Sequence, residues 1–108
     1  MFIEAEGEPV MRKRLLDLNP AKTVEWIHKY IRFELEFGDF YGNNLDALYD
    51  ALTSITEDTC IGVFCQPKDD SKLSVYLEKV KKVIKDAEQD NMHLCVIFGD
   101  MEENYEAD

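Results

Sequence analysis

The stretch of sequence that decides the fold is Thr59-Cys60-Ile61-Gly62-Val63-Phe64-Cys65. It is apolar or small throughout, without the alternation of polar and apolar residues that is typical of a half-exposed strand. Such a run indicates a parallel strand covered on both faces. A second apolar run, Leu94–Phe98, and a less apolar segment of the same length, Arg14–Leu18, supply two more strands. The Asn19-Pro20 dipeptide ends the first of the three strands.

Apolar residues at helical spacing lie between these strands. The segments 23–35, 45–54 and 73–90 each carry an apolar stripe, so each is expected to be a helix that packs on a core. Thr23 and Asn44 stand where N-caps are expected, and Gly38 to Asn44 form a tight loop whose glycines and asparagines can adopt positive φ. His28 falls on the first helix without a second histidine nearby, which favours a structural role at the surface or partly buried.

This order of elements predicts an α/β fold, with a small three-stranded parallel sheet packed with three to four helices. With 108 residues the chain is expected to form one domain, residues 1–108. Residues 1–10 are interpreted as an N-terminal extension, and residues 99–108 as an acidic C-terminal tail.

The formal net charge of −11 argues against ordinary nucleic-acid binding and favours a basic partner. No lysine or arginine occurs between Arg32 and Lys68, so the negative charge is concentrated there. Seven acidic residues fall in that interval: Glu34, Glu36, Asp39, Asp46, Asp50, Glu57 and Asp58.

No apolar run is long enough to cross a membrane, and the first residues do not resemble a secretory signal, so we expect a cytoplasmic protein. The three cysteines, Cys60, Cys65 and Cys95, lack the spacing of a zinc or redox motif and are expected to be buried and reduced. Cys60 and Cys65 should face opposite sides of one strand and not pair with each other. The sequence predicts neither a metal nor a cofactor.

Four side chains of the second predicted helix, Asp46, Tyr49, Asp50 and Thr53, lie opposite its leucines. Like charges at i and i+4 destabilise a helix by roughly 0.2–0.5 kcal/mol, and no nearby cation in the segment offsets them. The helix dipole favours Asp46 near the N-terminus but does little for Asp50. A role in binding explains the pair better than stability does. The rival interpretation, an enzyme using Asp46 and Asp50 as acid and base, lacks any accompanying catalytic motif.

The run from Phe40 to Thr53, FYGNNLDALYDALT, resembles the signature of the barstar family. In that signature an aromatic pair, a glycine and an asparagine precede a Leu-Asp-Ala-Leu-Trp-Asp helix. The elements before and after the run fit more loosely, and the resemblance extends from about Lys13 to Phe98. It implies a barstar-like fold and an inhibitor, not an enzyme, that blocks the active site of a basic secreted ribonuclease of the barnase type.

Carried over residue by residue, the resemblance implies that Asp50 occupies the enzyme's phosphate site and that Asp46 pairs with a second basic group. The whole partner-binding set comprises Phe40, Tyr41, Gly42, Asn43, Asn44, Asp46, Tyr49, Asp50, Thr53 and Asp86. Phe40 and Tyr49 would pack at the interface, Gly42 and Asn44 would shape the loop, and Asp86 would supply a more distant acidic contact.

Four positions depart from the family pattern. Tyr49 replaces a tryptophan, Phe40 lacks a tyrosine hydroxyl, Asn43 removes a charge and Asp86 is shorter than glutamate. An immunity protein for a different basic toxin domain therefore remains an alternative, as does a plain acidic scaffold. We expect a monomer that binds neither nucleic acid nor membrane.

Overall fold

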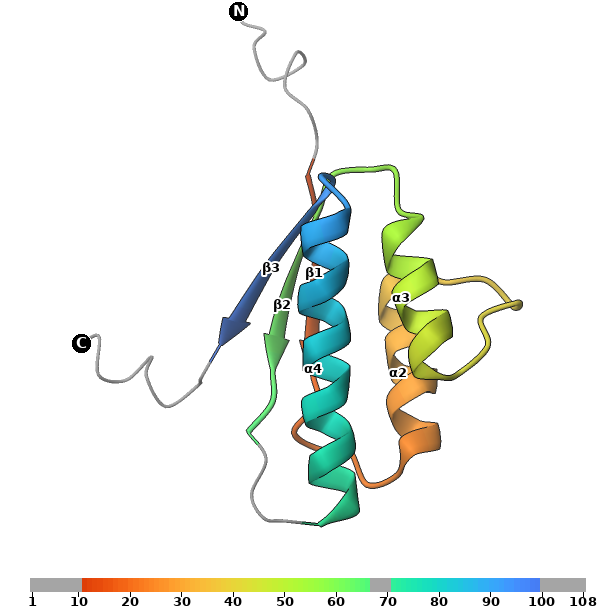
Figure 1. Ribbon diagram of the computed structural model, residues 1–108, viewed down its shortest axis with the longest axis vertical. Coiled ribbons are helices and arrows are strands. Elements are labelled where there is room, and N and C mark those ends of the chain that lie inside the picture. Colours follow the sequence, from red (N-terminus) through yellow and green to blue (C-terminus); the bar gives the residue numbers. More distant parts are fainter. Residues whose placement is uncertain (1–10, 67–70, 100–108) are drawn as a thin grey trace, which may run out of the picture.

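The computed structural model describes residues 11–66 and 71–99. In this part of the chain a parallel sheet lies beside a layer of helices (Figure 1). The strand order is β1-β2-β3, and both neighbouring pairs are parallel. The elements are β1 (Arg12–Asp17), α2 (Val24–Leu35), α3 (Leu45–Thr53), β2 (Thr59–Phe64), α4 (Lys72–Asp90) and β3 (Leu94–Gly99). The predicted α/β fold with a three-stranded parallel sheet is confirmed.

The core fills the space between the sheet and the helices. Leu16 of β1, Ile61 of β2 and Leu94 of β3 point into it, together with apolar residues of all three helices. α3 packs against α4, α4 lies against β3, and α2 lies against β1. Each helix therefore presents its outward face to solvent or to a partner. No helix of the described part is long and apolar enough to span a bilayer.

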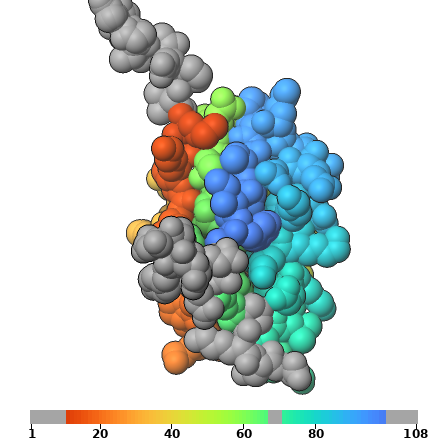
Figure 2. All heavy atoms as spheres, turned by 90° about the vertical axis from the view of Figure 1, so that its left-hand side faces the viewer, coloured from red at the N-terminus to blue at the C-terminus, as the bar shows by residue number. Residues whose placement is uncertain are grey.

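The helices of the described residues cover one face of the sheet and not both, so the prediction that residues 59–65 are covered on both faces is wrong. Figure 1 shows all the helices on the same side, and Figure 2 shows the three strands side by side on the other. The reason is topological. Both crossovers step in the same direction across the sheet, and crossovers of one hand then place their helices on one face.

The side of the sheet opposite the described helices, here called the open face, carries apolar side chains along β2, where a one-sided sheet ordinarily has polar ones. Along β2, buried residues alternate with the half-buried Cys60, Gly62 and Phe64. A Cβ on Gly99 would lie within 2.4 Å of the Phe64 ring, so this ring covers the backbone of β3. The apolar composition of both faces concealed the one-sided packing from sequence reasoning.

Burial of the cysteines also differs from the prediction. Cys65 is buried, but Cys60 and Cys95 are only partly so, because both lie on the open face. All three thiols are free. Cys60 is half-buried on the open face and Cys65 is buried, so the two side chains lie in different surroundings. The expected N-terminal extension and most of the acidic tail lie outside the described residues.

Candidate functional site

The N-terminal cap and the buried stripe of α3 together fix which side chains face outward. Asn44 has extended backbone, and its Oδ1 accepts a hydrogen bond from the backbone N–H of Ala47 at 2.7 Å, which confirms the predicted N-cap. Leu48 and Leu52 are fully buried. Because helical residues three and four apart share a face, the side opposite these leucines is turned away from the core.

Asp46 and Asp50 both lie on the exposed surface of α3. Within residues 11–66 and 71–99, neither carboxylate forms an ion pair with a lysine, arginine or histidine. Two like charges one turn apart thus remain without an internal counter-charge. This arrangement suits a surface that meets positive charge on another molecule.

Tyr49, between the two aspartates, is tied to the neighbouring helix. Its hydroxyl donates a hydrogen bond to the carboxylate of Asp90 in α4. This bond raises the pKa of Tyr49, and the negative charges of Asp90 and Asp86 add to the effect. Asp90 was missed by sequence reasoning because only the packing of α3 on α4 brings it here. Asp46, Tyr49, Asp50, Asp86 and Asp90 are called the acidic face below.

Asp86 and Thr53 have partners of their own. Asp86 is half-buried and forms an ion pair with Lys82 one turn earlier, with 3.0 Å between Nζ and Oδ2. Thr53 is also half-buried, and its hydroxyl lies 2.9 Å from the backbone carbonyl of Tyr49. Both residues therefore contribute less free polar surface than Asp46 and Asp50.

The loop from Glu36 to Asn44, here called the α2–α3 loop, takes its shape from two residues in the left-handed region. They are Glu36 with φ 60° and Asn43 with φ 59°. Neither Gly38 nor Gly42 has positive φ, so the expectation that these glycines supply it is wrong. Gly42 serves close packing, because a Cβ there would lie 3.2 Å from the Cβ of Ala47. The loop can therefore turn directly into α3.

A buried histidine fastens this loop to two helices. His28 of α2 is 0% exposed, and its Nδ1 lies 2.7 Å from the hydroxyl of Tyr41 in the loop. Its Nε2 lies 2.6 Å from the hydroxyl of Tyr76 in α4. Burial lowers the pKa of His28 and raises those of both tyrosines. His28 has the predicted structural role but is fully buried, and Tyr41 turns its polar end inward.

Phe40, next to Tyr41, has the opposite placement, since its side chain is 100% exposed. The preceding part of the loop is held by Arg32, which binds the carbonyl of Gly38 at 3.3 Å and the carboxylate of Asp39. A large aromatic ring is thus presented to solvent on an anchored segment. Such a ring is typical of a residue that inserts into a partner.

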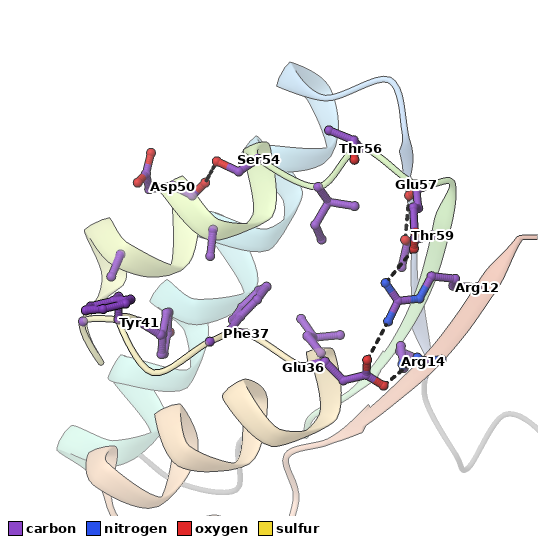
Figure 3. A pocket seen from close by; sticks show the side chains of 17 residues that line it. Arg12, Arg14, Glu36, Phe37, Tyr41, Asp50, Ser54, Thr56, Glu57 and Thr59 are labelled. Atoms are coloured by element: carbon purple, nitrogen blue, oxygen red, sulfur yellow. Dashed lines mark hydrogen bonds and ion pairs between the residues drawn. The ribbon is translucent and has the colours of Figure 1, made fainter.

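A pocket of about 580 Å³ opens between α3, the α2–α3 loop and the β1 edge of the sheet. Phe37, Tyr41, Ala51 and Ile55 give it apolar walls, and Asp50 lies at its α3 side (Figure 3). Across the pocket from Asp50 lies a group of ion-paired side chains. This pocket depends on tertiary packing and leaves no motif in the sequence.

The arginines and glutamates that line this side of the pocket form ion pairs with one another. Arg12 reaches Glu57 at 2.9 Å and Glu36 at 3.3 Å, and Arg14 reaches Glu36 at 3.0 Å (Figure 3). Both arginines project from the helix side of β1, where α3 does not cover the strand. Because each already has a carboxylate partner, neither arginine forms an ion pair with Asp50.

The described residues contain no cluster of three or more His, Cys, Asp or Glu side chains arranged to hold a metal ion. The ten residues expected from the sequence to bind a partner group as follows. Phe40, Asp46 and Asp50 are exposed, and the two carboxylates have no ion-pair partner in the described part of the chain. Tyr49, Thr53 and Asp86 are exposed in part and form internal bonds. Tyr41, Gly42, Asn43 and Asn44 shape the loop and the start of α3.

Comparison with known proteins agrees with this geometry. Residues 11–108 match the family model described as "Barstar (barnase inhibitor)". The chain is also similar to the protein named "Putative ribonuclease inhibitor YrdF" from Bacillus subtilis (strain 168), with 32% identity over 81 residues. That alignment covers 74% of this chain and 89% of the relative. The chain therefore belongs to the barstar family of barnase inhibitors.

Proposed function

We propose that this protein blocks the active site of a basic, secreted ribonuclease of the barnase type by inserting α3 and the α2–α3 loop into its cleft. Members of the barstar family are ribonuclease inhibitors and not enzymes, so Asp46 and Asp50 act in binding. The natural setting is the cytoplasm of the cell that makes the nuclease, before export. One inhibitor molecule engages one enzyme molecule.

One observation carries the proposal: Asp46 and Asp50 are exposed, one helical turn apart, and lack an internal counter-charge in the described structure. A ribonuclease cleft holds cations that bind RNA phosphates, and carboxylates can replace those phosphates. Asp50 then occupies the phosphate site, and Asp46 pairs with a second basic group. Binding removes both charges from water but supplies counter-charges and relieves their mutual repulsion.

The apolar part of the interface lies on the same side. Phe40 is fully exposed on an anchored loop, so it can pack against the enzyme at little cost in conformational entropy. The pocket beside Asp50 is large enough to receive a side chain of the enzyme. Tyr49, between the two aspartates, packs at the interface with the enzyme, and Asp86 adds a more distant acidic contact.

The test is the affinity of the Asp50→Asn variant for a barnase-like ribonuclease, measured by titration of nuclease activity. Removing one partner of a desolvated charge pair costs about 2–5 kcal/mol, which weakens binding roughly 30-fold to several-thousand-fold. This range is that of buried charge pairs in general, and close charge pairs of the barnase–barstar complex span a wider one, about 1.5–7 kcal/mol.

The matched control is Glu25→Gln, which removes one charge from the first turn of α2, where Glu25 pairs with Lys29. It should leave the affinity within about twofold, because an exposed ion pair contributes little. Equal affinities for wild type, Asp50→Asn and Glu25→Gln would contradict the proposed role of Asp50. Circular dichroism of each variant checks that the fold is kept.

A second candidate partner is a different basic toxin domain. Two observations favour it: the Tyr49 hydroxyl is already bonded to Asp90, and Asp86 is already paired with Lys82. Because of these two bonds, the Tyr49 hydroxyl and the Asp86 carboxylate are less available to an enzyme whose cleft is complementary to free side chains. Three results together would select this candidate. The protein would not inhibit a barnase-like enzyme at micromolar concentration, it would bind a different basic toxin domain, and Asp50→Asn would weaken that second complex.

A further inference from the structure

Two cysteines lie side by side on the open face, away from the helices. Cys60 of β2 and Cys95 of β3 are register partners on neighbouring parallel strands, and their Sγ atoms are 3.4 Å apart. Both side chains are partly exposed, and the Cys60 thiol donates a hydrogen bond to the sulfur of Cys95. The ribonuclease-binding proposal makes no use of this pair.

The backbone already satisfies the geometry of a disulfide. Facing residues on neighbouring strands are separated by about 4.8 Å, and Cα atoms joined by disulfides are typically about 4.4–6.8 Å apart. Register partners also direct their side chains to the same face of the sheet. The sulfurs need only close from 3.4 Å to the bond length of about 2.05 Å, which side-chain rotation provides.

We infer that Cys60 and Cys95 form a redox-active dithiol that closes to an intramolecular disulfide linking β2 to β3. The oxidant is a low-molecular-weight disulfide of the glutathione class. One protein thiolate attacks it, forms a mixed disulfide and releases one small thiol. The other protein thiolate then displaces the second small thiol. Two protein S–H bonds and one S–S bond are lost, and one protein S–S bond and two small thiols are formed.

The surroundings of the pair act on the Cys60 thiol in both directions. The hydrogen bond to Cys95 raises the pKa of Cys60. Lys13 is the register partner of Cys60 on β1. The positive charge of Lys13 lowers the pKa of Cys60, whereas the negative charge of the nearby Glu88 raises it. Either thiol can make the first attack, and the other then resolves the mixed disulfide, because both orders give the same product.

The third cysteine supplies an internal control. Cys65 lies beyond the end of β2 and is buried, and burial raises the pKa of its thiol. It is thus a poor nucleophile and hard to reach. We expect it to remain reduced under conditions that oxidise the pair.

The experiment incubates the full-length protein with glutathione buffers of increasing oxidised fraction, then alkylates free thiols in denaturant and determines the mass. The expected product is monomeric, has lost two hydrogen atoms and carries one alkyl group in place of three. Peptide mapping should join Cys60 to Cys95. The disulfide closes a loop of the unfolded chain, so the Tm should rise by roughly 5–15 °C relative to the reduced protein.

Three variants make the result specific. Cys65→Ser should still form the disulfide, whereas Cys60→Ser and Cys95→Ser should stop at a glutathione adduct on the remaining cysteine of the pair, with Cys65 still reduced. A persistent glutathione adduct on wild type, a bond through Cys65, a linked dimer or three free thiols throughout the series would each overturn the inference. The readout does not involve a nuclease, so it fails or succeeds independently of the proposed function.

Discussion

His28 is the residue on which the shape of the α2–α3 loop depends most directly. A neutral imidazole has one donor and one acceptor nitrogen, so it can accept from one tyrosine hydroxyl and donate to the other. Both nitrogens are used, by Tyr41 and Tyr76. A protonated ring would be a donor on both sides and would place a charge where no water reaches.

The protonation of His28 leads to a pH dependence of stability. Burial lowers its pKa in the folded protein below the ordinary value of 6.5, so the unfolded chain takes up the proton first. Stability is therefore complete above about pH 6.5 and declines as the pH falls from there toward the lowered pKa.

The measurement is the free energy of unfolding in urea at about pH 7.5 and about pH 5.5, for wild type and for His28→Gln. Glutamine can donate and accept without titrating, so the variant should lose less stability between these two pH values. Equal losses in both proteins would show that His28 is not the group responsible.

Sequence reasoning at the scale of single residues succeeded where a feature depends on local spacing. The outward placement of Asp46 and Asp50 follows from helical periodicity alone. It failed where a feature depends on which elements become neighbours. The pairing of Tyr49 with Asp90 and the contact between Cys60 and Cys95 both require the tertiary arrangement.

At the scale of elements, α3 is short and carries an internal repulsion, so its cap is important. Asn44 Oδ1 satisfies one backbone N–H at the start of the helix, and its Nδ2 lies 3.3 Å from the carbonyl of Gly42. We expect Asn44→Ala to lower the free energy of unfolding by about 1 kcal/mol.

Urea denaturation measures this effect, and Asn44→Ser is the matched control because serine retains a capping oxygen. Serine should recover most of the loss. If alanine and serine are equally stable, the side-chain cap does not contribute as the structure suggests.

The helices were predictable because each carries a clear helical period, and the strands because each is a short, largely apolar run. Predicted and observed boundaries differ by a residue or two, as for β1, expected from Arg14 and observed from Arg12. The layer arrangement was less predictable. Cys60, Gly62 and Phe64 are apolar on the open face, so the composition of β2 does not reveal that helices cover only one side.

At the scale of the whole molecule, the net charge of −11 should govern how fast the complex forms. Long-range attraction to a basic enzyme accelerates encounter, and salt screens it, since the Debye length falls from about 10 Å at 0.1 M to about 3 Å at 1 M. We expect kon to fall about tenfold or more over this range, and koff to change much less.

Stopped-flow mixing at several salt concentrations gives both rate constants. Phe40→Ala, which leaves every charge in place, should show the same salt dependence of kon with a faster koff. A salt effect confined to koff would contradict electrostatic steering by the acidic chain.

The junction of Tyr41, His28 and Tyr76 has a consequence for genetics. If the proposed function holds, a random screen for variants that no longer inhibit the nuclease should recover substitutions at His28 and Tyr76, although neither lies on α3 or the α2–α3 loop. Such alleles would misplace Phe40 and its neighbours while the acidic side chains of α3 stay intact. Second-site substitutions that restore inhibition should then fall in the core next to this junction. Substitutions that add charge to the surface should not restore it.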